Sequence, residues 1–156
     1  MAILQKLKEH FSRDSVTLDL QDIQALILRS RPEPYVGVHA MLHFDEAAGA
    51  RNLLGRLAPH IASADNWSED LDFWIGAALS FEGLKALGVP DAQLKTFPLP
   101  FQQGMAARAE QLRDFGPNAP ENWEDVFKPG NCHLALTIYA VDDDALDKAL
   151  ATARTE

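Results

Sequence analysis

The sequence contains a single cysteine, Cys132, among 156 residues, which excludes an internal disulfide and a metal site built on two cysteines. Cys132 falls on the apolar side of an alternating pattern, so we interpret it as a small buried side chain rather than a reactive thiol. Positive charge is also scarce, because 14 Lys and Arg face 23 Asp and Glu, for a net charge of −9. This balance argues against nucleic acid or an anionic membrane surface as a partner, since both attract basic proteins.

Long hydrophobic runs are absent as well. The first residues, MAILQKLKEHF, carry charges at Lys6, Lys8 and Glu9, which is typical of neither a signal peptide nor a membrane span. We therefore interpret residues 1–19 as a leader and predict a cytoplasmic protein.

Several motifs that carry chemistry are missing. The sequence holds no GxGxxG or GxxxxGK[ST] phosphate loop and no GxSxG nucleophile elbow. Three consecutive acids, Asp142, Asp143 and Asp144, fit a helix N-terminus better than a calcium site, because no EF-hand loop surrounds them.

The histidines do not form a metal site by spacing. His39 and His43 share one face of a predicted strand, where about 3.3 Å per residue separates their α-carbons by roughly 13 Å. That distance is too long for one metal ion, and no carboxylate or cysteine is placed to help. His133 lies on a strand that we expect beside theirs, so one cross-strand pair is possible.

Residues 71–90 form the best defined stretch, a strand followed by a capped helix. Alternate apolar residues at 73, 75, 77 and 79 predict one inward face. Ser80 stands at the N-cap position, Gly88 ends the helix and Pro90 prevents its continuation.

Other elements follow the same logic. Alternation predicts strands over residues 35–44 and 131–141, each followed by a helix, with Asp45 as N-cap of the first. A weaker strand is predicted at 25–28. Between the second and third strong strands we expect a break at 98–101, a helix over 104–114 and a loop-rich segment over 116–130, anchored by Trp123 and Phe127.

The order of these elements predicts an α+β fold, a ferredoxin-like antiparallel sheet packed on helices. A helical insertion of about fifty residues precedes the third strand, far longer than an ordinary connection. The last strand of the ferredoxin pattern is missing. The strand at 35–44 should therefore have an open edge, unless residues 25–28 or another chain cover it.

Four segments, in order, resemble the dye-decolourising (DyP-type) haem peroxidases. They are LQDIQALIL at 20–28, residues 71–90, the series from Phe97 to Val126, and HLALTIYAVDDDALD at 133–147. In the third segment the matching residues are Phe97, Phe101, Gly104, Met105, Arg108, Ala109, Leu112, Asp114, Gly116, Ala119, Pro120 and Trp123. We interpret this series as structural, with Arg108 and Asp114 bracing the following loop.

The resemblance implies a b-type haem held by a proximal histidine in the C-terminal half, with an aspartate of a GxxDG motif and an arginine cleaving peroxide. This sequence has no Asp-Gly pair, and we expect that motif beyond residue 156. None of its five histidines, His10, His39, His43, His60 and His133, sits in the proximal motif. We therefore predict no catalytic, cofactor-binding or metal-binding residue in this chain.

The resemblance leads us to interpret residues 20–156 as the N-terminal ferredoxin-like domain of a DyP-type peroxidase. The full enzyme would oxidise organic substrates with hydrogen peroxide through haem b, whereas this chain alone should be inactive and bind no haem stably. A second copy or the missing C-terminal domain is the expected partner, through the open sheet edge. Two alternatives remain: a stand-alone dimeric binding module without catalysis, and a small α+β-barrel enzyme with a cofactor near His39, His43 or His133.

Overall fold

A computed structural model describes residues 18–29, 33, 35–66, 68 and 70–154. Residues 1–17 of the predicted leader lie outside these ranges. The sheet has three antiparallel strands in the order β1-β3-β2: β1 (Val36–Leu42), β2 (Phe73–Leu79) and β3 (Leu134–Ala140). This confirms the predicted ferredoxin-like α+β class. Within the described residues β1 pairs with β3 alone, so its outer edge is open, as predicted.

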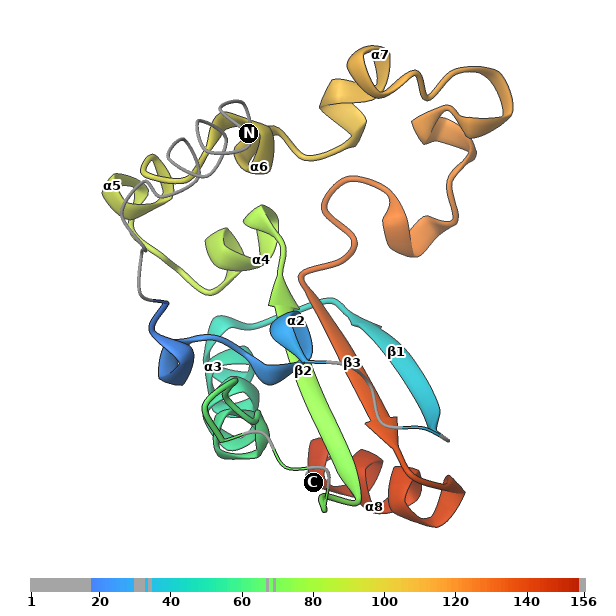
Figure 1. Ribbon diagram of the computed structural model, residues 1–156. Coiled ribbons are helices and arrows are strands. Elements are labelled where there is room, and N and C mark those ends of the chain that lie inside the picture. Colours follow the sequence, from blue (N-terminus) through green and yellow to red (C-terminus); the bar gives the residue numbers. More distant parts are fainter. Residues whose placement is uncertain (1–17, 30–32, 34, 67, 69, 155–156) are drawn as a thin grey trace, which may run out of the picture.

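The helices are α2 (Ala25–Leu28), α3 (Ala47–Leu57), α4 (Phe81–Ala86), α5 (Asp91–Leu94), α6 (Leu99–Gln103), α7 (Ala109–Leu112) and α8 (Asp143–Ala153). Six single 3-10 turns join them: η1 (Leu20–Asp22), η2 (Ala58–His60), η3 (Ala106–Arg108), η4 (Gly116–Asn118), η5 (Pro120–Asn122) and η6 (Asp125–Phe127). Segments α5 to η6 make up the insertion, which lies beyond the end of the sheet where β2 ends and β3 begins (Figure 1).

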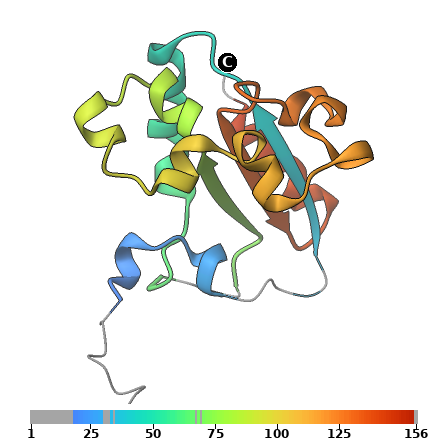
Figure 2. The same cartoon turned by 90° about the horizontal axis from the view of Figure 1, so that it is seen from above.

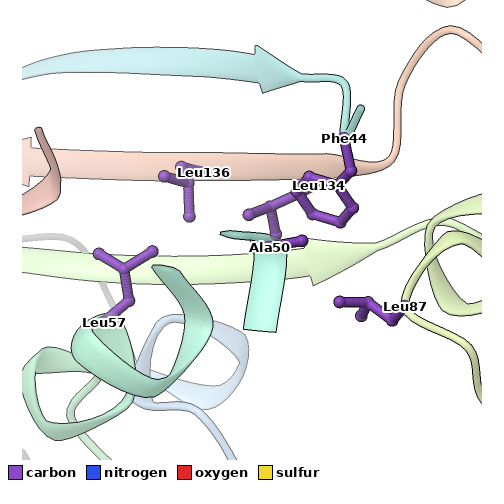
Figure 3. Packing of buried hydrophobic residues seen from close by; sticks show 6 residues of the cluster. All are labelled: Phe44, Ala50, Leu57, Leu87, Leu134 and Leu136. Atoms are coloured by element: carbon purple, nitrogen blue, oxygen red, sulfur yellow. The ribbon is translucent and has the colours of Figure 1, made fainter. Parts of the chain in front are cut away.

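The core lies between the sheet and the two long helices, α3 and α8. Every second residue of β3 is buried, from Leu134 at 0% exposure to Ala140 at 0%, which is the predicted period of two. Leu57 of α3 and Leu134 of β3 belong to one buried cluster (Figure 3). Ile75, Ile138 and Ala149 of α8 form a second cluster. Burial on this one face of the sheet supplies the main driving force for folding.

Predicted helix starts are confirmed at two of three sites. The Ser80 hydroxyl accepts a hydrogen bond from the Gly83 amide at 2.9 Å, and the Asp142 carboxylate accepts one from the Ala145 amide at 2.8 Å. The prediction of Asp45 as N-cap is wrong by one residue, because Glu46 occupies that position, without a side-chain cap bond. Gly88 has a φ of 75° after α4, the left-handed geometry that its sequence position predicts.

The predicted strand at 25–28 is wrong, because Ala25–Leu28 forms the helix α2. Gln24, the residue before α2, covers one sheet edge with its side chain. Its side-chain amide group donates to the Ala77 carbonyl at 2.7 Å and accepts from the Ala77 amide at 2.8 Å. A side-chain amide thus replaces one residue of a neighbouring strand, and the edge it covers is that of β2 rather than β1. Leu26 packs over Gly76 on the sheet face opposite α3 and α8, with its Cδ1 3.0 Å from the position of a Cβ at Gly76.

The insertion also differs from its prediction. The expected break at 98–101 lies largely within helix α6, which has Pro98 at its N-cap and Pro100 in its first turn, where proline suits a helix. The expected single helix over 104–114 divides into η3 and α7, since Arg108 has a non-helical ψ of 12°. Figure 2 shows this part of the chain from above, as a series of short turns rather than a packed bundle.

Candidate functional site

A hollow of about 790 Å³ lies between the insertion, the start of α4 and the residues just before β3. We call it the insertion groove. Its apolar lining includes Phe81, Phe101, Met105, Trp123, Phe127 and Cys132. Its charged lining comprises Glu82, Arg108, Glu124 and Lys128.

Aromatic contacts shape one wall of the groove. Phe101 of α6 meets Phe81 of α4 edge to face, with 5.9 Å between ring centroids. The ring centroid of Phe97 lies 5.2 Å from that of Phe101. Edge-to-face packing is the geometry that ring quadrupoles favour. On the other wall the Trp123 indole N–H donates to the Asn118 carbonyl at 2.8 Å. These contacts fix the walls of the groove without filling it.

Large apolar side chains of the insertion remain exposed, which is unusual for a segment that supports a fold. Met105 is 63% exposed and Phe127 is 52% exposed, so the prediction of Phe127 as an anchor of its segment is wrong. Leu99 and Phe115 are exposed to a similar degree. An apolar surface of this kind is typical of a face that packs against another part of a protein.

Arg108 and Asp114 were each predicted to brace the following loop, but the side-chain contacts found among the described residues do not show this. The Arg108 guanidinium donates to the Gln111 side chain at 3.2 Å, so it stabilises the turn it belongs to. Among the described residues, the Oδ2 atom of Asp114 is buried and has no hydrogen-bond partner. The series from Phe97 to Val126 therefore contains one buried carboxylate oxygen, the Oδ2 of Asp114, for which the described residues offer no partner.

The histidines of adjacent strands do form one cross-strand contact, between His43 and His133. Their rings stack at 4.1 Å between centroids, with 28° between the ring planes. His133 is only 6% exposed, and its Nδ1 accepts a hydrogen bond from the Phe44 amide at 2.9 Å. Burial first, and the charge of His43 second, lower the pKa of His133 below its ordinary value of 6.5. The buried ring is therefore neutral at neutral pH.

This role of His133 corrects two predictions that alternation alone had made. Alternation predicts that His133 and Leu134 point to opposite faces of the strand, with only Leu134 buried. Both side chains are buried, and the His133 ring accepts a hydrogen bond from the Phe44 amide. Cys132 was expected among the buried apolar residues, yet it is half-buried in the groove lining, with its Sγ 3.8 Å from the Sδ of Met41. Nothing in the sequence marks a hydrogen bond between residues 89 positions apart.

The remaining histidines lie outside the groove. His39 pairs through its Nδ1 with the Thr137 hydroxyl at 3.0 Å on the sheet surface. His60 is exposed in η2, and His10 lies outside the described residues. Across the described ranges, no three His, Cys, Asp or Glu side chains gather to hold a metal ion.

A haem with an axial histidine does not fit the groove as it stands. Its described lining contains no histidine to serve as an axial ligand. The groove is apolar enough for a ring or a helix to pack in it, but it offers no axial imidazole.

No helix in the described ranges has the length and apolar character needed to cross a bilayer. No curated protein sequence matches the chain. Solved structures do match. An ancestral D-type dye decolorizing peroxidase superimposes with a TM-score of 0.71 and 26% identity, over 87% of this chain and 30% of that one. A dye-decolorizing peroxidase from Auricularia auricula-judae gives a TM-score of 0.69 and 23% identity, over 87% of this chain and 30% of that one.

A DyP-type peroxidase from Anabaena sp. gives a TM-score of 0.67 and 23% identity, over 85% of this chain and 31% of that one. The chain thus spans about 30% of the length of the first solved structures it matches. The family model described as the DyP dimeric alpha+beta barrel domain matches residues 48–155, which include most of α3 and all of β2, the insertion, β3 and α8. On the strength of that match, the chain belongs to the DyP family.

Proposed function

We propose that residues 20–156 act as the N-terminal ferredoxin-like domain of a DyP-type haem peroxidase, preceded by a short leader. The full enzyme would oxidise organic substrates with hydrogen peroxide. The observation that carries this proposal is the family match over residues 48–155 in a chain that spans about 30% of its solved relatives. The insertion groove supports it, because exposed apolar side chains such as Met105 and Phe127 would be covered by a further part of the enzyme.

The proposal places the chemistry outside this chain. Haem b would be held in the full enzyme, with its axial ligand and the residues that cleave peroxide supplied from elsewhere. In this chain we assign no catalytic, haem-binding or metal-binding residue, and we place the protein in the cytoplasm. The chain by itself should therefore be catalytically inactive.

A titration with haem tests the proposal. Added to the purified 156-residue chain, haem should produce no saturable Soret band with a stoichiometry of one, because no described histidine faces the groove. Serum albumin, which binds haem in a defined pocket, serves as the positive control. A sharp endpoint at one haem per chain, with the spectrum of a histidine-ligated iron, would show that the haem site is complete here.

A second candidate function is a stand-alone binding module that dimerises through the open edge of β1. It is favoured by the pairing of β1 with β3 alone among the described residues and by the match to a domain family described as dimeric. Exposed strand edges pair readily with other strands. Light scattering over a rising concentration series should then give the mass of a dimer, while a monomer at every concentration would contradict pairing through this edge.

A further inference from the structure

The buried imidazole of His133 joins three segments that are far apart in the sequence. Its Nδ1 accepts the Phe44 amide at 2.9 Å, just after the end of β1. The ring also hydrogen-bonds to the backbone of Gly130, in the loop that leads to β3. Its own carbonyl accepts the Ser80 amide at 3.0 Å, at the N-cap of α4. One residue thus holds the end of β1, the loop before β3 and the start of α4 together.

The Phe44 contact requires the neutral form of the ring, whereas the Gly130 contact favours the charged form. A nitrogen that accepts an N–H bond cannot carry a proton, so protonation of Nδ1 would turn the Phe44 contact into two facing donors. The ring of His43 stacks at 4.1 Å, so a proton on both rings would also place two positive charges face to face. Acidification therefore works against this joint in two ways.

Charged groups surround the ring from each neighbouring segment. His43 approaches from the end of β1, Asp45 from the link to α3 and Glu82 from α4, while the loop contributes the Gly130 backbone. Lys128 of the same loop is paired with Asp125 at 2.6 Å. The Gly130 backbone and the two carboxylates favour a charged ring, but burial and His43 outweigh them, and the pKa of His133 lies below 6.5.

The joint adjoins the insertion groove. Ser80 and Cys132 both line the groove, and the Ser80 hydroxyl donates to the Cys132 carbonyl at 2.7 Å. We propose that His133 is a pH-sensitive latch: its neutral ring holds the segment after β1 through the Phe44 amide, and its protonation releases that segment from the start of β3, beside the groove. This inference concerns a conformational change of the chain itself and does not depend on the peroxidase assignment.

The sign of the effect follows from linkage. A histidine whose pKa is lowered in the closed state binds more protons when the latch is open, so closure is most stable above pH 6.5. As pH falls below 6.5, the opening constant should rise by up to about tenfold per pH unit. The rise should end once pH falls below the lowered pKa of the closed state.

Amide hydrogen exchange on the full chain, measured by NMR between pH 7.5 and roughly pH 4.5 to bracket the histidine range, tests the latch. After correction for intrinsic exchange, the opening constant of the Phe44 amide should rise on acidification. That of the Ala64 amide, which donates to Ile23 at 2.7 Å away from the latch, should stay constant. If both amides change together, or if neither changes, the latch is wrong.

Two variants sharpen the experiment. His133→Asn keeps a neutral acceptor near the position of Nδ1, and should remove the pH dependence at Phe44. His39→Asn changes an exposed histidine of the same sheet and should keep it. If His133→Asn fails to fold, an NMR titration of the unaltered chain measures the pKa of the His133 ring and tests the latch instead. A pKa lowered below its ordinary value supports the latch, and an ordinary or raised one overturns it.

Discussion

Replacing Gly83 with alanine is expected to lower the free energy of unfolding by about 3 kcal/mol, the upper end of the usual overpacking cost. A Cβ on Gly83 would lie 2.1 Å from the His133 carbonyl oxygen and 2.8 Å from its carbonyl carbon. Both atoms belong to the backbone just before β3, so neither can rotate away. Helix propensity alone would predict the opposite sign, a gain of about 1 kcal/mol for alanine over glycine inside a helix. We expect the steric term to win, because the carbonyl is also bonded to the Ser80 amide.

Gly55→Ala is the matched control, since it makes the same change in a helix with open space. Nothing lies within 4 Å of a Cβ at Gly55 in α3, so alanine should raise the free energy of unfolding by about 0.5–1 kcal/mol. Urea denaturation followed by circular dichroism measures both variants. Equal effects of the two substitutions would contradict the close packing of α4 on His133.

Truncating Ile138 to alanine should lower the free energy of unfolding by about 2–5 kcal/mol, because it leaves a cavity in the core. Ile138 is 1% exposed on the central strand, opposite Val38 of β1 and Ile75 of β2. Its cluster includes Ala149 of α8, and Leu146 and Leu150 of the same helix pack against that cluster. A loss of this size is a large share of the 5–15 kcal/mol that stabilises a typical domain.

Ile27→Ala makes the same chemical change on the surface. Ile27 is 69% exposed in α2, so its truncation should change stability by no more than about 0.5 kcal/mol. Urea denaturation midpoints compare the two variants directly. A loss at Ile138 as small as that at Ile27 would mean that β3 is not the centre of the core.

Much of the fold could be predicted from the sequence, because its signals are local. Alternation along β3 shows in the sequence as Leu134, Leu136, Ile138 and Ala140, and the caps at Ser80 and Asp142 lie within three residues of the amides they bind. The sheet order follows from the ferredoxin-like topology once the strands are known. These elements needed no knowledge of distant contacts.

The failures all involve contacts between distant residues or competing local signals. Gln24 reaches the backbone of Ala77, 53 positions away, so a segment with strand character forms a helix beside the sheet. His133 turns inward for the Phe44 amide and reverses the expected side of Cys132. Pro98 looked like a break although it stands at the N-cap of α6.

The candidate site was predictable only in part. Resemblance identified the segment that forms the insertion, and the possible pairing of His133 with a histidine of the first strand is confirmed by the His43 stack. The groove itself could not be predicted, because it depends on how short helices such as α6 and α7 lie against α4. The exposed side chains of Met105 and Phe127 look in the sequence like ordinary core residues.

Peroxide-dependent oxidation of a dye tests most directly whether the chemistry lies outside this chain. The purified 156-residue chain, mixed with one equivalent of haem, is compared with the same concentration of haem alone. We expect equal rates, because no described residue of the insertion groove offers an axial imidazole to the iron. A rate per haem far above that of free haem, abolished by heat denaturation of the chain, would contradict the proposal.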